Sequence, residues 1–204
     1  MSLAQDSGES DVDFAVGWNA TASLPDRRAE AAVADLLLAL GCDVDDANLV
    51  GTPQRVVASF RELLRREPLT MTTFPNEEGY DDLVLVREIP FTSLCAHHLL
   101  PFRGVAHVGY LPGTRLLGLS KLARVVEHFA RDLQLQERLT VQIADYLTSA
   151  LTPNGVGVVL EAEHLCMSIR GAHAPTARTR TARFTGALAE HGWERFGDMS
   201  PCRV

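Results

Sequence analysis

Apolar side chains recur every three to four residues in four stretches of the chain, which is the spacing of an amphipathic helix. These stretches are residues 26–40, 52–66, 120–133 and 136–151. Residues that typically start or stop helices support two of the predicted helix ends. Gly41 follows the first stretch, and Thr52 and Pro53 open the second as helix cap and first helical residue. The pattern predicts two helices in the first third of the chain and two beyond its middle.

Elsewhere the pattern alternates with the period of two that is typical of strands. Strands are expected at residues 83–91, 104–111, 156–161 and 165–169. Residues 67–80, which contain two prolines, an asparagine and a glycine, are expected to form a loop. The order of elements predicts an α+β fold in which an antiparallel sheet is backed by two helices, with a helical extension at the N-terminus.

The chain divides into four predicted regions. They are a mobile N-terminal arm over residues 1–22, a helical region over 23–80, the region of sheet and paired helices over 81–188, and a tail over 189–204. The N-terminus has no apolar segment of the kind found in secretion signals, and no run of 18 apolar residues indicates a membrane span. Four cysteines are too few for a disulfide-rich secreted protein. We therefore expect a cytoplasmic protein without a membrane partner.

The charge of the chain is negative overall and uneven along its length. The formal net charge of −7 argues against a nucleic-acid partner. Residues 1–94 carry 17 acidic and 7 basic side chains, whereas residues 95–204 carry 9 and 12. A basic half in an acidic protein suits a small polyanion such as a nucleoside triphosphate, although a chance imbalance explains the split equally well.

Two short segments carry the residue types that bind transition metals. Cys95, His97 and His98 lie close together, and His164 and Cys166 follow on a later expected strand, where alternation places both on one side. Cys95, His98 and Cys166 suit a catalytic Zn²⁺ with a fourth position for water, which leaves His97 and His164 for proton transfer. Two alternatives stay open at this point: a closed structural zinc site that includes His164, and buried cysteines without a metal.

A second group of residues suits an anionic ligand. Ser120 begins an expected helix, where unpaired N–H groups favour anions, and Lys121 and Arg124 share one face of it. Lys121 is the single lysine of the chain, which favours a site that needs a compact ammonium, an ordinary surface lysine being the alternative. Arg170 adds a cation that can hold a phosphate. Glu137 opens the next helix, where it could accept from the paired donors of a guanine edge or serve only the helix terminus.

Together these segments resemble the GTP cyclohydrolase I family. The resemblance covers roughly residues 24–188, and its motifs occur in the family's order. They are Gly51-Thr-Pro-Gln-Arg55, Ser93-Leu-Cys-Ala-His-His98, Gly109-Tyr-Leu-Pro112, Gly118-Leu-Ser-Lys-Leu-Ala-Arg124, Leu135-Gln-Glu-Arg-Leu-Thr140, Gly155-Val-Gly-Val-Val159 and Glu163-His-Leu-Cys-Met167. The resemblance implies the tunnelling fold, a homodecamer with active sites between subunits, and conversion of GTP and water to 7,8-dihydroneopterin triphosphate and formate.

The resemblance also implies a role for each matching residue. Cys95, His98 and Cys166 match the ligands of one zinc ion per subunit, and His97 and His164 match the histidines that move protons near the purine ring. Glu137, with Gln136, matches the guanine anchor. The matches to ribose and triphosphate contacts are Ser120, Lys121, Arg124, Arg170 and Arg55, the last supplied by a neighbouring subunit.

One position departs from the family pattern. Ala96 stands where family members usually have a glutamate beside the metal and both histidines. Loss of such a neighbour typically costs about 10–100-fold in metal affinity or activity, and Glu161 and Glu163 are the candidates to replace it. The alternative function is an impaired or repurposed relative that binds GTP or a pterin, or acts on a modified guanine nucleotide.

Overall fold

The structure is a computed structural model that describes residues 26–197. The predicted arm over residues 1–22 and the last residues of the predicted tail lie outside the described part. The described chain forms two compact units that divide after Arg65, whereas the sequence pattern extends the helical region to residue 80. No helix in the described range is long and apolar enough to cross a membrane.

The first unit is a pair of helices, α1 (Asp26–Ala39) and α2 (Thr52–Leu64), which pack against each other. Gly41 follows α1 with a φ of +81°, a conformation that glycine adopts without strain. Thr52 is the first helical residue of α2 rather than its cap, because Gly51 takes the cap position. The Thr52 hydroxyl accepts a hydrogen bond from the Arg55 guanidinium at 2.9 Å instead.

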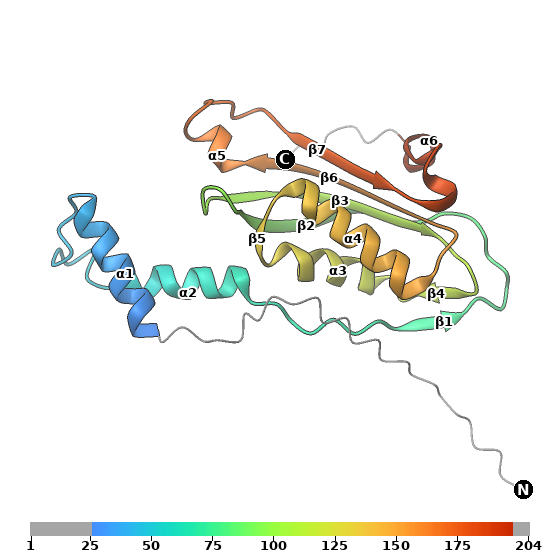
Figure 1. Cartoon of the computed structure of the whole chain (residues 1–204), viewed down its shortest axis with the longest axis horizontal. Coiled ribbons are helices and arrows are strands. Elements are labelled where there is room, and N and C mark those ends of the chain that lie inside the picture. Colours follow the sequence, from blue (N-terminus) through green and yellow to red (C-terminus); the bar gives the residue numbers. More distant parts are fainter. Residues whose placement is uncertain (1–25, 198–204) are drawn as a thin grey trace, which may run out of the picture. The chain divides into compact units, whose positions relative to one another are not determined.

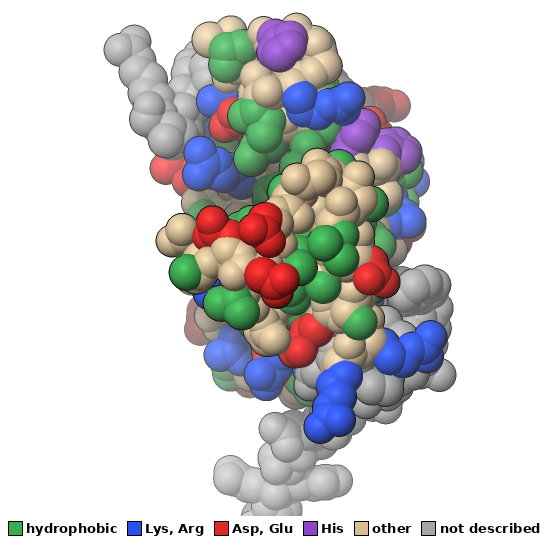
Figure 2. All heavy atoms as spheres, turned by 90° about the vertical axis from the view of Figure 1, so that its left-hand side faces the viewer, with side chains coloured by type: hydrophobic (Ala, Val, Ile, Leu, Met, Phe, Trp, Pro, Cys, Tyr) green, Lys and Arg blue, Asp and Glu red, His purple; other side chains and the backbone are tan. Residues whose placement is uncertain are grey.

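The loop between α1 and α2 is acidic. Asp43, Asp45 and Asp46 are all exposed, and acidic side chains gather on the face of the molecule drawn in Figure 2. The carboxylates of Asp43 and Asp46 accept hydrogen bonds from the backbone N–H groups of Asp45 and Asn48. These two aspartates therefore stabilise turns within the loop, as aspartate commonly does.

The second unit contains a five-stranded sheet with the strand order β5-β2-β3-β6-β7. Its strands are β2 (Val84–Cys95), β3 (Pro101–Leu111), β5 (Leu133–Gln134), β6 (Gly155–His164) and β7 (Thr179–Phe184). Neighbouring strands run antiparallel except β5, which pairs with β2 in parallel. In this register the end of β2, the start of β3 and the end of β6 lie side by side. The candidate site lies at this end of the sheet.

Helices α3 (Ser120–Ala130) and α4 (Gln136–Leu151) cover one face of this sheet (Figure 1). Alternate residues of the strands point into the layer between sheet and helices and are almost fully buried, as a period of two requires. Among them are Phe102, Ala106, Val108, Val158 and Leu160. The prediction of an α+β fold with an antiparallel sheet backed by two helices is confirmed.

The opposite face of the sheet is covered at one end by the C-terminal part of the chain. There η1 (Gly186–Leu188) and α6 (Gly192–Phe196) place Leu188 and Phe196 against Leu111 and Val159. The Phe196 ring fits because Gly157 has no side chain, since a Cβ there would lie 2.4 Å from the ring. The start of the predicted tail is therefore packed onto the sheet.

Three local predictions differ from the structure. Within the expected loop 67–80, β1 (Thr73–Pro75) pairs with β4 (Arg115–Leu117). The sequence pattern does not indicate β7, a mostly polar strand at the edge of the sheet. Residues 165–168 form helix α5 (Leu165–Ser168) instead of a strand. The pairing of β6 ends at His164, opposite Phe102, and the preceding residue of β3 is Pro101, which has no backbone N–H to donate.

Candidate active site

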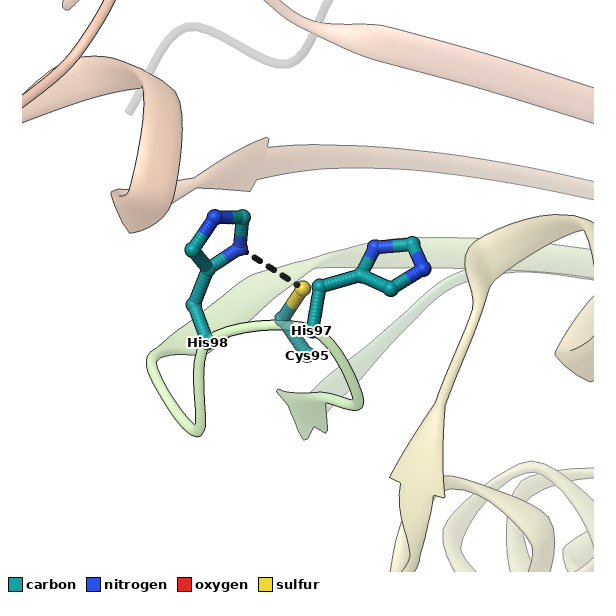
Figure 3. Close-up of side chains that lie close together, drawn as sticks. All are labelled: Cys95, His97 and His98. Atoms are coloured by element: carbon teal, nitrogen blue, oxygen red, sulfur yellow. Dashed lines mark hydrogen bonds between the residues drawn. The ribbon is translucent and has the colours of Figure 1, made fainter.

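Three candidate metal ligands lie in one tight loop between β2 and β3. Cys95 ends β2, and its carbonyl accepts hydrogen bonds from the N–H groups of His98 (3.2 Å) and Leu99 (2.8 Å), which fold the chain back. The Sγ of Cys95 and a ring nitrogen each of His97 and His98 all lie within 4.8 Å of one another (Figure 3). Cys95 is buried, whereas both imidazoles are exposed. We call these three residues the Cys-His cluster.

The spacing within the Cys-His cluster suits a tetrahedral metal ion. The Cys95 Sγ lies 3.6 Å from His98 Nδ1, the contact that is dashed in Figure 3. A zinc ion bound at about 2.3 Å to sulfur and about 2.0–2.1 Å to nitrogen separates the two ligand atoms by roughly 3.6 Å. Cys95 and His98 therefore already have the separation of two ligands that share one ion. His97 belongs to the same cluster, so two imidazoles lie within reach of that ion.

Cys166 reaches the cluster from a second segment, helix α5. Burial raises the pKa of its thiol, and Cys95 raises it further through its charge and a hydrogen bond. Arg170 acts in the opposite direction, so this exposed cation also lies near the sulfur. Among the described residues, Cys166 does not belong to the group whose ligand atoms all lie within 4.8 Å of one another. The member of that group next to Cys166 is Cys95. Two adjacent thiols oppose each other's ionisation, and a divalent cation between them removes this conflict.

The placement of Cys166 corrects one expectation. His164 and Cys166 do not alternate along one strand: His164 is the last residue of β6, and Cys166 lies within α5. The end of the β6 pairing at His164 starts the helical turn, and the turn carries Cys166 toward Cys95. The two residues still lie at one end of the sheet, as the metal hypothesis requires.

His164 is held on two sides. Its ring stacks on that of Phe102, with 4.6 Å between ring centroids and 3° between planes, and its Nε2 lies 2.7 Å from Oε1 of Gln136. Burial lowers the pKa of His164, and the carboxylate of Glu137 acts in the opposite direction. The imidazole is therefore neutral near pH 7, a form with one donor and one acceptor nitrogen.

Strand β5 ties the start of α4 to the Cys-His cluster. Gln134 pairs with Cys95, and its carbonyl accepts a hydrogen bond from the N–H of Ala96 at 3.0 Å. Because α4 begins two residues later, Gln136 and Glu137 lie at the same end of the sheet as the cluster. Glu137 is exposed, and the first N–H groups of a helix have no partner within it. This helix start therefore offers both a carboxylate acceptor and backbone donors to a ligand.

Three of the residues predicted to contact the ribose and triphosphate, Ser120, Lys121 and Arg124, start at the opposite end of the sheet. The N–H of Leu117 donates to the hydroxyl of Tyr110, near the end of β3 that is remote from the Cys-His cluster, and α3 begins three residues later. The 11 residues of β3 span about 30 Å. Ser120 and Arg124 are exposed, and Lys121 is only 8% exposed. Within one chain, these three residues are not brought to the cluster.

Arg55 lies in α2, in the other compact unit. Its exposed guanidinium donates to the carbonyl of Asn48 at 3.2 Å and to the hydroxyl of Thr52 at 2.9 Å. These bonds hold the side chain against the start of its own helix. The role of Arg55 as a phosphate contact for a neighbouring subunit stays a prediction.

Neither candidate for the missing glutamate faces the Cys-His cluster. Glu161 and Glu163 alternate with the residues of β6 that point toward the helices, so they lie on the other face of the sheet. The Glu161 carboxylate accepts two hydrogen bonds from Arg180, at 2.9 and 2.6 Å. The Glu163 carboxylate lies 3.9 Å from the guanidinium of Arg103. Neither carboxylate therefore takes the position beside Ala96.

Two residues that shape this region were not among the predicted site residues. Phe102 supports the ring of His164, and Gln134 is fully buried beside the cluster, where its Nε2 donates to the carbonyl of Phe129 and to Oε1 of Gln142. Both roles depend on strand register: Phe102 faces His164 across β3 and β6, and Gln134 pairs with Cys95. Local sequence patterns do not contain this information.

A family model and two similar proteins carry the same enzyme name. A family model described as GTP cyclohydrolase I matches residues 29–198. A protein named GTP cyclohydrolase 1 from Streptomyces griseus subsp. griseus is 49% identical over 179 residues, covering 85% of this chain and 89% of that protein. One of the same name from Mycobacterium tuberculosis is 52% identical over 174 residues, covering 83% of this chain and 86% of that protein.

One solved structure, an archaeosine synthase QueF-Like in the apo form, is similar with a TM-score of 0.42 and 18% sequence identity, over 52% of this chain and 95% of that one. The family model and the relatives cover most of the chain at about half identity. The chain therefore belongs to the GTP cyclohydrolase I family of enzymes.

Proposed function

We propose that this chain converts GTP and water to 7,8-dihydroneopterin triphosphate and formate, with one Zn²⁺ per subunit held by Cys95, His98 and Cys166. The observation that carries the proposal is the meeting of two distant chain segments at one end of the sheet. The Cys-His cluster comes from one segment, and the other supplies Cys166 and His164. The relatives named GTP cyclohydrolase 1 support GTP as the substrate.

The donor set supports zinc. Two thiols and an imidazole are common zinc ligands, and three protein ligands are the number that catalytic zinc sites use. Zn²⁺, when bound, supplies a Lewis acid that makes water nucleophilic at neutral pH. The 3.6 Å separation of Cys95 Sγ and His98 Nδ1 fits two ligands of such an ion.

Two histidines are suited to move protons during ring opening and formate release. His164 is neutral near pH 7 because burial lowers its pKa, and its ring is held by Phe102 and Gln136. His97 is exposed beside His98, with 6.1 Å between the ring centroids. An imidazole within hydrogen-bond reach of the substrate contributes about 10²–10⁴-fold to such a step.

The start of α4 supports recognition of guanine. The carboxylate of Glu137 is exposed there and has two oxygens, which match the N1–H and the exocyclic amine of guanine. Backbone N–H groups of the same helix turn can donate to the carbonyl oxygen of the base. We assign Glu137 to the guanine contact, with Gln136 at the neighbouring position.

The triphosphate contacts support an assembly of several copies. Ser120, Lys121 and Arg124 start about 30 Å along β3 from the Cys-His cluster, a separation longer than one nucleotide. If both groups bind the same GTP, they come from different subunits. We therefore propose a homo-oligomer with sites between subunits, a decamer as in the family, in which Arg170 and the Arg55 of a neighbour complete the cationic side of the site.

The alternative of an impaired or repurposed relative is motivated by Ala96. Neither Glu161 nor Glu163 replaces the missing carboxylate. The proposed ligands, both histidines and Glu137 are nevertheless all present, and the similar proteins carry the name GTP cyclohydrolase 1. These observations favour the cyclohydrolase function over the alternative.

The decisive experiment measures turnover of GTP by the purified, zinc-loaded protein. Formate and the pterin product, which is measured by its fluorescence after oxidation, should both accumulate with time and in equal molar amounts. Binding of zinc and GTP without either product would contradict the proposal. The variant Ala96→Glu would then separate the alternatives, because regained turnover would identify Ala96 as the cause of the loss.

A further inference from the structure

The side chain of Gln136 is buried and fully engaged within its own subunit. The residue is only 1% exposed, at the first position of α4. Its Nε2 lies within hydrogen-bond distance of three acceptors, which are the carbonyl oxygens of Leu160 (3.2 Å) and Thr179 (2.9 Å) and the hydroxyl of Thr181 (3.2 Å). Its Oε1 lies 2.7 Å from Nε2 of His164. The amide therefore has partners on both of its ends.

These partners determine which way the amide points. Carbonyl oxygens can only accept hydrogen bonds, so the NH₂ group must face Leu160 and Thr179. A flipped amide would set its oxygen against two other carbonyl oxygens and lose these bonds. Oε1 therefore faces His164 in the only orientation that satisfies the network.

Two threonine hydroxyls complete the network in one consistent direction. The Thr140 hydroxyl donates to the backbone carbonyl of Gln136 at 2.8 Å. It must then accept from the hydroxyl of Thr181, 2.6 Å away, which leaves the Thr181 oxygen to accept from Gln136 Nε2. Each hydroxyl donates once and accepts once, so no proton in the ring of bonds is left without an acceptor.

The fixed amide determines the proton position on His164. Because Gln136 Oε1 can only accept, the Nε2 of His164 must carry a hydrogen, and Nδ1 is the ring nitrogen that is left to exchange a proton with a substrate. The ring of Phe102, parallel to the imidazole within 3°, keeps the ring in the plane in which this bond forms. The imidazole is thereby held in one tautomer and one orientation.

We infer that the Gln136 side chain is a positioning residue that acts on the reaction through His164, by fixing its Nε2–H tautomer and presenting Nδ1 to the purine. The inference rests on the proposed function in so far as His164 moves a proton. It differs from a guanine contact by this side chain, because both ends of the amide are already bonded within the subunit. The exposed Glu137 and the backbone of α4 are left for the base.

The first test is spectroscopic and needs no turnover. Nitrogen NMR of the zinc-loaded protein labelled with ¹⁵N-histidine distinguishes the two tautomers, and the His164 signals are assigned by their loss in His164→Gln. Wild-type His164 should be in the Nε2–H form, and Gln136→Met should populate both forms. An Nδ1–H tautomer in the wild type would overturn the inference, whether or not the variant folds or the enzyme turns over GTP.

The second test separates positioning from substrate binding. Gln136→Met should lower kcat by about 10–100-fold, an effect comparable to the loss of a partner that orients a metal ligand, with zinc content and GTP affinity unchanged. In a His164→Gln background the same change should cost no further activity, because the residues act as a unit. Weaker GTP binding with kcat unchanged would instead assign Gln136 to the guanine contact and overturn the inference.

Discussion

The ring of Phe102 lies parallel to that of His164, with 4.6 Å between their centroids. The contact follows from sheet register, because the two residues face each other across β3 and β6. Phe102 is fully buried, so the same side chain supports the core and the orientation of the imidazole. Stability and turnover should therefore respond together when this ring is replaced.

Phe102→Leu should destabilise the protein and slow its reaction. The change keeps an apolar side chain but removes the flat surface under His164, and we expect a loss of about 1–2 kcal/mol in the free energy of unfolding. Turnover of GTP should also fall at temperatures where the variant is still fully folded. The fall is then larger than the lower stability alone would cause. Urea unfolding and steady-state kinetics on the same preparation measure both quantities.

Phe91→Leu is the matched control for this experiment. Phe91 is also buried and packs edge-on against Phe102, with 6.1 Å between ring centroids, but its contact is with the phenylalanine. It should cost similar stability and leave kcat near the wild-type value. Equal losses of kcat in both variants would assign the effect to general loosening of the core.

Cys166→Ala should abolish metal retention. The loss of one of two neighbouring sulfurs leaves Cys95 and His98 as the proposed ligands, and a zinc site rarely persists with two. Zinc content after extensive dialysis, measured by elemental analysis, should fall from one ion per subunit to nearly none, and turnover should be lost with it. Cys42→Ala is the control, because Cys42 lies in the α1–α2 loop and forms no disulfide with any described residue. A Cys166→Ala protein that keeps its zinc would show that His97 or another residue completes the site.

The cysteine and histidine residues illustrate how far sequence patterns reach. Cys95 and His98 are three residues apart, so their proximity follows from any tight turn and is predictable. Cys166 is predictable as a residue type, but its approach to Cys95 depends on where the β6 pairing stops. The periodicity of its segment indicates a strand, whereas the chain forms a helical turn directly after the last residue of β6 that pairs with β3.

Gln136 and Lys121 mark the limit of local patterns. The helix that begins at Gln136 is evident from its apolar spacing, but the burial of the amide depends on β7, which the pattern does not indicate. Lys121 is evident as the single lysine, yet its separation from the Cys-His cluster follows from the length of β3. Long-range pairing, which no short segment encodes, decides both positions.

Glu137→Gln should weaken binding of guanine nucleotides more than binding of inorganic triphosphate. A neutral amide presents one acceptor and one donor where guanine needs two acceptors, so one hydrogen bond is lost and one donor is left opposed. Competition binding with GTP and inorganic triphosphate measures the two affinities. Glu127→Gln is the control, because Glu127 is an exposed carboxylate on α3 that pairs with Arg131, the residue after the helix. A variant that weakened both ligands equally would contradict the role of Glu137 in base recognition.

His107 should make the stability of the fold sensitive to mild acid. It lies on β3 opposite Val159 and is only 7% exposed, and its buried Nδ1 has no hydrogen-bond partner among the described residues. Burial lowers its pKa below the ordinary value of 6.5. The surrounding charges oppose one another, since Arg87 and Arg180 lower this pKa and Glu88 and Glu161 raise it.

The sign of the effect follows from proton linkage. Below about pH 6.5 the unfolded chain binds a proton at His107 that the folded chain does not, so the free energy of unfolding should fall as the pH drops through this value and level off below the folded pKa. His107→Gln removes this titration and should reduce the slope of stability against pH. Urea unfolding at a series of pH values from about 8 to about 5.5, at constant protein concentration, measures that slope. An unchanged slope in His107→Gln would assign the acid sensitivity to other groups.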